Sequence, residues 1–155
     1  MSGVRQEQER LFTSQVVRLS RVYRKEANRG LGGCGISDAQ ALPVLHIARC
    51  GGGVRQNVLA EEIGIEGPSL VRLLDQLCAH GLVERRDDTC DRRAKTLHLT
   101  SAGNALAARI EAALSQVRSG LLASVSDADL EAALRVLGAL EEGLAARADA
   151  SKADR

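Results

Sequence analysis

The stretch of sequence that decides the fold is LAEEIGIEGPSLVRLLDQLCAHGLVERRDDTCDRRAKTLHLTSAG, residues 59–103. Its middle part predicts a helix from Pro68 to Gly81, because proline is favoured at the first helical position and glycine just after the last one. The apolar residues of this helix fall on one continuous arc that we expect to face the core: Leu70, Val71, Leu73, Leu74, Leu77 and Cys78. The remaining arc presents polar side chains to the outside: Ser69, Arg72, Asp75 and Gln76.

The residues on either side complete a compact motif. A short helix is expected at residues 56–63, closed by Gly64. After the 68–81 helix, residues 82–86 and 96–99 predict two short strands, which the charged segment 87–95 joins. Two short helices with a tight glycine-containing turn, followed directly by a two-stranded hairpin, are typical of a winged helix-turn-helix, in which the hairpin forms the wing.

A longer helix is expected before this motif. Residues 8–29 carry apolar side chains at three- and four-residue spacing, which predicts an amphipathic helix. The glycine-rich residues 30–35 are expected to break any helix, and Ser37 with Gln40 resembles a capping box for the next one. That next helix is expected to end at the glycines of residues 51–53.

Two further helices are expected after the hairpin, capped by Thr100 and Ser126. Each has an apolar stripe at helical spacing: Leu106, Ile110, Leu114, Val117 and Leu121 in the first, and Leu130, Leu134, Leu137, Leu140 and Leu144 in the second. Apolar stripes of this length cannot all be buried inside one small subunit, so a homodimer is expected. Residues 148–155 are expected to form a frayed tail.

This order of elements predicts a mainly α fold with a small β-hairpin wing. A chain of 155 residues buries one adequate core, so one compact fold per subunit is expected. Within it we expect an N-terminal dimerisation helix and linker (residues 1–36), a winged helix-turn-helix DNA-binding region (37–101), and C-terminal dimerisation helices with a tail (102–155).

The composition excludes several classes of protein. No stretch is apolar and long enough to cross a membrane, and the N-terminus lacks a secretory signal, so a cytoplasmic protein away from the membrane is expected. The cysteines have no C-x-x-C spacing and the histidines no i, i+4 pair, so neither a metal site nor a cofactor is expected. The motifs of hydrolases, P-loop proteins and metalloproteases are absent, so the chain is not expected to be an enzyme and no catalytic residue is assigned.

The polar face of the 68–81 helix is the candidate major-groove contact. The second helix of a helix-turn-helix enters the major groove of duplex DNA, which is wide enough to admit a helix. Arginine donates two hydrogen bonds to the edge of guanine, so Arg72 is expected to read a base directly. The other residues expected at the major groove are Pro68, Ser69 and Gln76.

The loop of the hairpin is the candidate minor-groove contact. Arg92, Arg93 and Lys95 lie within reach of the flanking minor groove, where narrow A·T-rich steps concentrate negative potential. Between residues 55 and 99 there are seven Lys or Arg and eight Asp or Glu, a net charge of −1. Binding is therefore expected to depend on a few well-placed arginines and to show a shallow salt dependence.

Residues 59–103 resemble the DNA-binding core of the MarR family of transcriptional regulators, in particular its SlyA-type branch. The motifs that carry the resemblance are PSLVR at residues 68–72 and the D-x-R of the wing, matched by Asp91 and Arg93. The resemblance implies that Asp91 supports the wing through an ion pair and that Arg93 enters the minor groove. It also implies that Ser69 and Arg72 contact the major groove, and that the first, fifth and sixth helices intertwine with those of a partner subunit.

The family resemblance further implies a regulator, expected to be a repressor, that binds a pseudo-palindromic operator as a homodimer. Small aromatic or phenolic carboxylates often bind between the dimerisation helices and the winged domain of such proteins and disfavour the spacing that fits DNA. They act through the difference between their affinities for the arrangement that fits DNA and for the one that does not. Arg18 and Arg21 of the first helix, with His46, are our candidate residues for holding such a carboxylate. Solvated arginines, or arginines that bind phosphate, are an equally good interpretation of the first two.

Two alternatives remain open from the sequence. In one, the DNA-binding module is kept but a thiol is the sensor, with Cys90 in the wing loop as the leading candidate. In the other, the chain is a winged-helix protein-interaction module that does not bind DNA, as the near-neutral charge of the motif would allow. Loss of DNA binding on Arg93→Ala discriminates the regulator from the interaction module.

Overall fold

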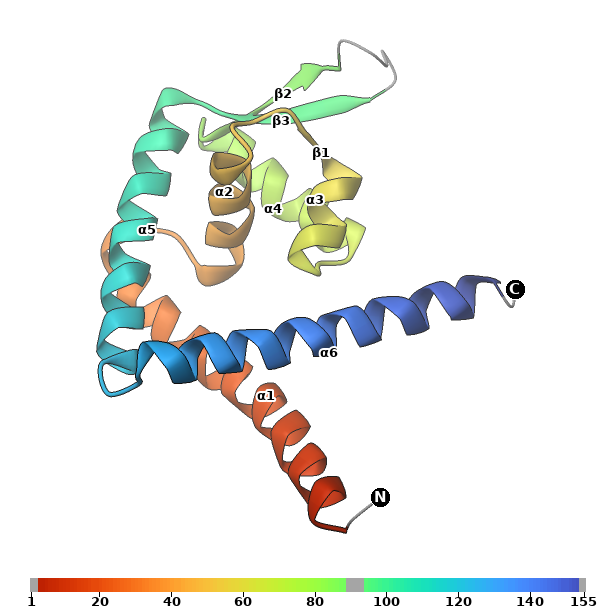
Figure 1. Ribbon diagram of the computed structural model, residues 1–155. Helices are drawn as coiled ribbons and strands as arrows, with labels where there is room; N and C mark the ends of the chain where they lie inside the picture. The colour runs from red at the N-terminus through yellow and green to blue at the C-terminus, as the bar shows by residue number, and fades with distance from the viewer. Residues whose placement is uncertain (1–2, 89–93, 154–155) are drawn as a thin grey trace. The chain divides into compact units, whose positions relative to one another are not determined.

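The computed structural model describes residues 3–88 and 94–153 (Figure 1). In chain order the elements are α1 (Gly3–Gly30), the 3-10 helix η1 (Leu31–Cys34), α2 (Asp38–Arg49), β1 (Val54–Arg55), α3 (Gln56–Ile63), α4 (Gly67–Ala79), β2 (Val83–Asp87), β3 (Lys95–Leu99), α5 (Ser101–Leu122) and α6 (Asp127–Ala153). The chain divides into two compact units, one up to Arg118 and the other from Ser119 onward. Among the described residues, no helix has both the length and the apolarity needed to cross a bilayer.

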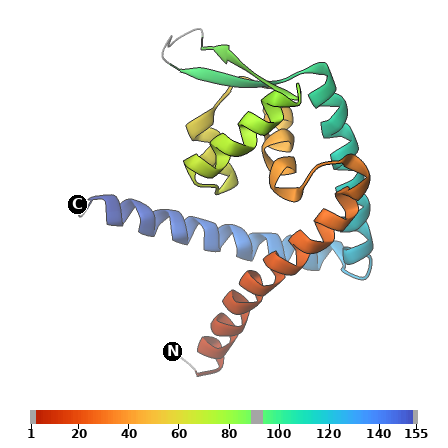
Figure 2. The same ribbon diagram turned by 180° about the vertical axis from the view of Figure 1, so that it is seen from behind.

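The core of the first unit lies between α2, α3, α4 and the first half of α5. Figures 1 and 2 show α2, α3 and α4 grouped together against the small sheet. Ile47 of α2, Leu59 of α3 and Leu74 of α4 are fully buried, and Ile110 of α5 joins them. Each such side chain contributes roughly 1.5–3 kcal/mol through burial, so these helices are held together by their apolar faces.

Helix α4 has the face that its sequence predicts, with one exception. Leu70, Leu74 and Leu77 are buried, while Ser69 and Arg72 are exposed. The prediction that Val71 faces the core is wrong, because its side chain is 37% exposed. Val71 lies at the edge of the apolar arc, beyond the strip that the neighbouring helices cover.

The sheet has three antiparallel strands in the order β1-β3-β2. The hairpin strands β2 and β3 pair in the expected way, with Val83 opposite Leu99 and Asp87 opposite Lys95. Strand β1 was not expected from the sequence, because its two residues are too few to show a strand periodicity. It pairs with β3 through Val54 and Leu97 and so fixes the start of α3 against the wing.

The expected helix caps are present. Ser37 and Gln40 form a capping box at the start of α2, and the Thr100 hydroxyl accepts a 3.0 Å hydrogen bond from the amide of Gly103. Ser126 caps α6 in the same way, accepting a 3.1 Å bond from the amide of Asp129. Gly64 ends α3 in the left-handed conformation at φ 66°.

Residues 30–35 end the first helix as expected, because α1 stops at Gly30 and α2 begins at Asp38. The 3-10 helix η1 over Leu31–Cys34, with Leu31 fully buried, was not expected. Burial of that leucine stabilises helical backbone that glycine alone disfavours. The expectation of a frayed tail is wrong for residues 148–153, because α6 extends to Ala153, and residues 154–155 lie outside the described residues.

The apolar stripes of the flanking helices are only partly covered within the described chain. In α5, Leu106, Ile110 and Leu114 are buried, whereas Leu121 is 54% exposed. The exposed large apolar side chains of α1 are Val4, Leu11, Val17, Leu19, Val22 and Tyr23. Those of α6 are Leu130, Leu134, Val136, Leu137 and Leu144. Exposed apolar stripes of this size are typical of surfaces through which proteins associate.

Candidate nucleic-acid interface

The first part of the candidate interface is the exposed face of α4. Pro68 lies in the first turn of this helix, and Ser69 and Arg72 are exposed beside it. Leu70 and Leu74 anchor the opposite face in the core. The helix therefore presents its N-terminal residues on a rigid support, which is the arrangement that a recognition helix needs.

Arg72 is the single Lys or Arg between Gly67 and Ala79. Within residues 3–88 and 94–153, no carboxylate pairs with it, whereas Arg85 and Arg86 of the wing each have an acidic partner. An exposed guanidinium without a protein partner keeps its donors available for a phosphate or a base edge. Arg72 is thus the leading candidate for a DNA contact among the residues that the structure describes.

Arg85 joins the wing to α4. Its guanidinium donates a 2.7 Å hydrogen bond to the carboxylate of Asp75, which lies on the exposed side of α4. The pair neutralises the acidic residue on a face that would otherwise repel phosphate. Sequence reasoning missed this pair, because residues ten positions apart in a helix and a strand meet only once the fold is known.

Gln76 lies beside α2. Its side-chain oxygen accepts a 3.2 Å hydrogen bond from the side-chain nitrogen Nε2 of Gln40. This contact orients Gln76 toward the N-terminal turn of α2, so its predicted place at the major groove stays a prediction.

The wing is braced at its base. Arg55 of β1 donates a 2.8 Å hydrogen bond to Asp88, whose side chain is only 10% exposed, and Lys95 pairs with Asp87 across the two strands. Arg55 was not singled out from the sequence, where nothing links it to a residue 33 positions away. The wing residues expected to contact DNA or support the wing, Asp91, Arg92 and Arg93, lie outside the described residues, as does Cys90.

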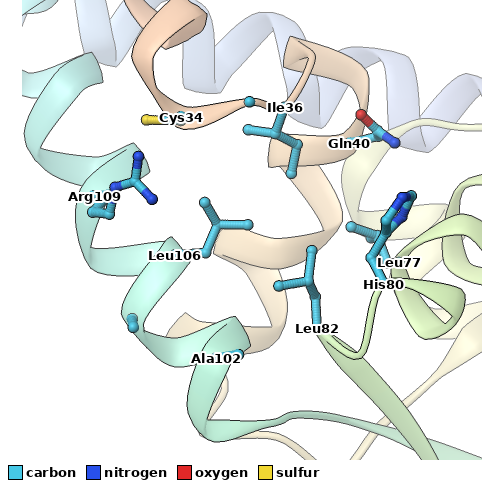
Figure 3. A pocket seen from close by; sticks show the side chains of 11 residues that line it. Cys34, Ile36, Gln40, Leu77, His80, Leu82, Ala102, Leu106 and Arg109 are labelled. Atoms are coloured by element: carbon cyan, nitrogen blue, oxygen red, sulfur yellow. The ribbon is translucent and has the colours of Figure 1, made fainter.

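A cavity of about 430 Å³ lies between the start of α2, the end of α4 and the first half of α5 (Figure 3). Apolar side chains make up much of its lining, among them Ile36, Leu77, Leu82 and Leu106. Its polar lining residues include Gln40, His80 and Arg109, and the guanidinium of Arg109 donates a 2.6 Å hydrogen bond to the carbonyl of Gly33. An apolar cavity with a few polar groups is typical of a small-molecule site.

Comparison with known proteins agrees with this geometry. The model of the MarR family matches residues 35–94. The transcriptional regulator PA3341 is 38% identical, its crystal structure superposes with a TM-score of 0.80, and the match covers 86% of this chain and 97% of that one. The chain belongs to the MarR family. It is accordingly a winged-helix DNA-binding transcriptional regulator, which confirms the resemblance seen at residues 59–103.

Two more distant MarR-type folds have been solved with a partner bound. One is S. aureus MepR, solved in complex with DNA: its sequence is 23% identical to this chain, and its structure superposes with a TM-score of 0.75 over 84% of this chain and 95% of that one. CouR from Rhodococcus jostii RHA1, solved with p-coumaroyl-CoA, is 22% identical with a TM-score of 0.75, over 81% and 87% of the two chains. At this identity both show a shared fold.

The residues predicted to hold a carboxylate do not line the 430 Å³ cavity. Arg18 and Arg21 are exposed on α1. His46 is half-buried, pairs with Glu62, and lines a second cavity to which α1 contributes Tyr23. The role of these three residues in ligand binding stays a prediction. The larger cavity, which sequence reasoning missed, takes its arginine from α5 because helices distant in sequence form its walls.

Proposed function

We propose that this MarR-family chain is a repressor that binds a pseudo-palindromic operator as a homodimer and is released by a small aromatic or phenolic carboxylate. In each subunit α4 enters a major groove and the wing follows the flanking minor groove. The observation that carries this proposal is the exposed, unpaired Arg72 on a helix whose other face is anchored by Leu70 and Leu74, within the described residues. That helix is the recognition helix of the motif.

Dimerisation supplies the symmetry that such an operator requires. A two-fold dimer presents two recognition helices to half-sites about one helical turn apart. The exposed apolar side chains of α1 and α6 support the dimer, because a second subunit would remove them from water. MepR, a structural relative, was solved in complex with DNA.

The effector is proposed to occupy the 430 Å³ cavity. A ligand there would touch α4 through Leu77 and α5 through Leu106, so its size would change the spacing of the recognition helix from the long helices. Arg109 would pair with the carboxylate, while apolar side chains would hold an aromatic ring. CouR, another structural relative, was solved with p-coumaroyl-CoA, the thioester of a phenolic acid. The ligand acts only through the difference between its affinity for the spacing that fits DNA and its affinity for the changed spacing.

Selection from a randomised duplex pool tests the proposal. The wild-type chain should enrich an inverted repeat, and the isolated site should be bound by a dimer. Arg72→Ala should lose or loosen that binding, whereas Arg147→Ala, which removes the same charge from an exposed position on α6, should not. A folded dimer that enriches no sequence would contradict the proposal and favour the protein-interaction module.

A further inference from the structure

His46 and Cys50 place two metal-binding atoms one helical turn apart. His46 lies in the last turn of α2 and Cys50 is the residue that caps the C-terminal end of this helix. The sulfur of Cys50 lies 3.4 Å from Nε2 of His46. An i, i+4 spacing puts both side chains on the same face of the helix, so the contact is built into the local backbone.

A third donor comes from a different helix. The carboxylate of Glu62, near the end of α3, contacts Nε2 of His46. One donor atom from each of the three residues lies within 4.8 Å of the others. The cluster therefore joins α2 to α3, the first helix of the helix-turn-helix.

The separation between the Cys50 and His46 donors fits zinc, and so does the chemistry of all three donors, whereas Glu62 lies closer to His46 and has to move back to bind the same ion. With the usual bond lengths to sulfur, nitrogen and oxygen, the donors of a tetrahedral zinc site lie about 3.3–3.8 Å apart, and the separation between Cys50 and His46 falls in this range. A thiolate and an imidazole suit zinc and its neighbours among the transition metals, whereas magnesium and calcium take oxygen ligands. Three protein ligands leave a fourth position for water.

The surroundings leave room for a cation. A cavity of about 380 Å³ adjoins the cluster and is lined by His46 and Glu62 together with Arg49 and Arg118. Both arginines pair with Glu111, so a carboxylate outside the cluster partly neutralises the positive charge that would oppose a cation there. Glu62 is exposed, so its carboxylate has space to move back from the imidazole and admit an ion.

We propose that His46, Cys50 and Glu62 bind a zinc ion that links α2 to α3. Binding releases the thiol proton of Cys50 to solvent, and the proton between Nε2 of His46 and the Glu62 carboxylate leaves Nε2 for solvent or for Nδ1 of the same ring. The contact between Glu62 and His46 is then replaced by one bond from each residue to the metal. Because α3 packs on α4, the ion holds together the helices that position Arg72. This inference differs from the expectation of no metal, which considered His–His pairs and sequence spacing but not a His–Cys pair completed by another helix.

Titration of the chelator-treated full-length protein with cobalt(II), a spectroscopic substitute for zinc, tests the site. The expected result is one equivalent of cobalt per chain, with a near-ultraviolet thiolate-to-cobalt absorption and the visible bands of a tetrahedral complex, both removed by added zinc. Cys50→Ser should abolish the thiolate absorption. His46→Gln and Glu62→Gln should each weaken zinc binding at least about tenfold, measured by competition with a chromophoric chelator.

Matched variants separate the site from adventitious binding. Cys34→Ser, His80→Gln and Glu61→Gln change the same residue types elsewhere in the first unit and should leave the cobalt spectrum and the zinc affinity unchanged. Circular dichroism of the metal-free variants checks that each is folded. The proposal is overturned if the wild type gives no thiolate absorption, if the absorption survives in Cys50→Ser, or if it depends on Cys34.

Discussion

Arg85 of β2 donates a 2.7 Å hydrogen bond to Asp75 of α4, so the first strand of the wing is tied directly to the recognition helix. Exposed ion pairs contribute little to stability, about 0–1 kcal/mol. The value of this pair lies instead in its position, because it neutralises a carboxylate that faces the proposed DNA surface.

Arg85→Ala should therefore weaken DNA binding more than it weakens the fold. The substitution removes a positive charge and leaves Asp75 unneutralised near phosphate, whereas the double variant Arg85→Ala/Asp75→Ala removes the repulsive charge as well. Fluorescence anisotropy with a labelled operator should show that the double variant recovers part of the lost affinity. A double variant that binds no better than Arg85→Ala would show that Asp75 does not face the DNA.

Gly103→Ala should destabilise the protein. A Cβ at this position would lie 2.0 Å from the carbonyl oxygen of Leu82, so the first turn of α5 would have to move away from the start of the wing. Overpacking of this kind costs about 1–3 kcal/mol, measured as the free energy of unfolding in urea. Gly138→Ala is the control: nothing lies within 4 Å of its Cβ, and alanine should stabilise α6 by roughly 0.5–1 kcal/mol. Equal effects of the two changes would contradict the close approach.

Leu134→Glu should weaken the dimer. Leu134 is 60% exposed in the chain by itself and lies on the apolar stripe of α6, where a charge would be buried in the proposed interface. Analytical ultracentrifugation should show a rise of at least about tenfold in the dimer Kd, which corresponds to about 1.4 kcal/mol. Glu141→Lys alters an exposed charged residue of the same helix and should leave the dimer intact. An unchanged Kd for Leu134→Glu would place the interface elsewhere.

Arg109→Gln should weaken the binding of aromatic carboxylates, because it removes the guanidinium from the 430 Å³ cavity. Isothermal titration with a panel of such acids measures the effect, and removal of a charge-assisted bond should cost about 1.5–3 kcal/mol. Arg18→Ala and Arg21→Ala decide between this cavity and the site first expected from the sequence. Loss of affinity in those two variants, with none in Arg109→Gln, would move the effector site to α1.

Features set by local chemistry were predictable from the sequence. The caps at Ser37, Thr100 and Ser126 depend on neighbouring residues alone, and so does the glycine that ends α3. The buried face of α4 was predictable because its leucines repeat with the helical period. Val71 shows the limit of that periodicity, since the width of the covered strip depends on neighbouring elements.

Features that depend on distant residues were not predictable. The pair of Arg85 with Asp75 forms only when β2 has been placed beside α4, and the pair of Arg55 with Asp88 only when β1 has been placed beside the residue that follows β2. The same holds for the two-residue strand β1 and for the cavity that contains Arg109. The proposed zinc site was not predictable for the same reason, because no spacing along the chain relates Glu62 to His46.

The most direct test of the central claim is the affinity of the wild type and Arg72→Ala for the selected operator and for a scrambled duplex, measured at one salt concentration. If Arg72 reads a base, the substitution should cost about 1–3 kcal/mol on the operator and much less on the scrambled duplex, so that specificity falls. An equal loss on both duplexes, or no loss on either, would contradict the assignment of Arg72 and of α4 as the reading helix.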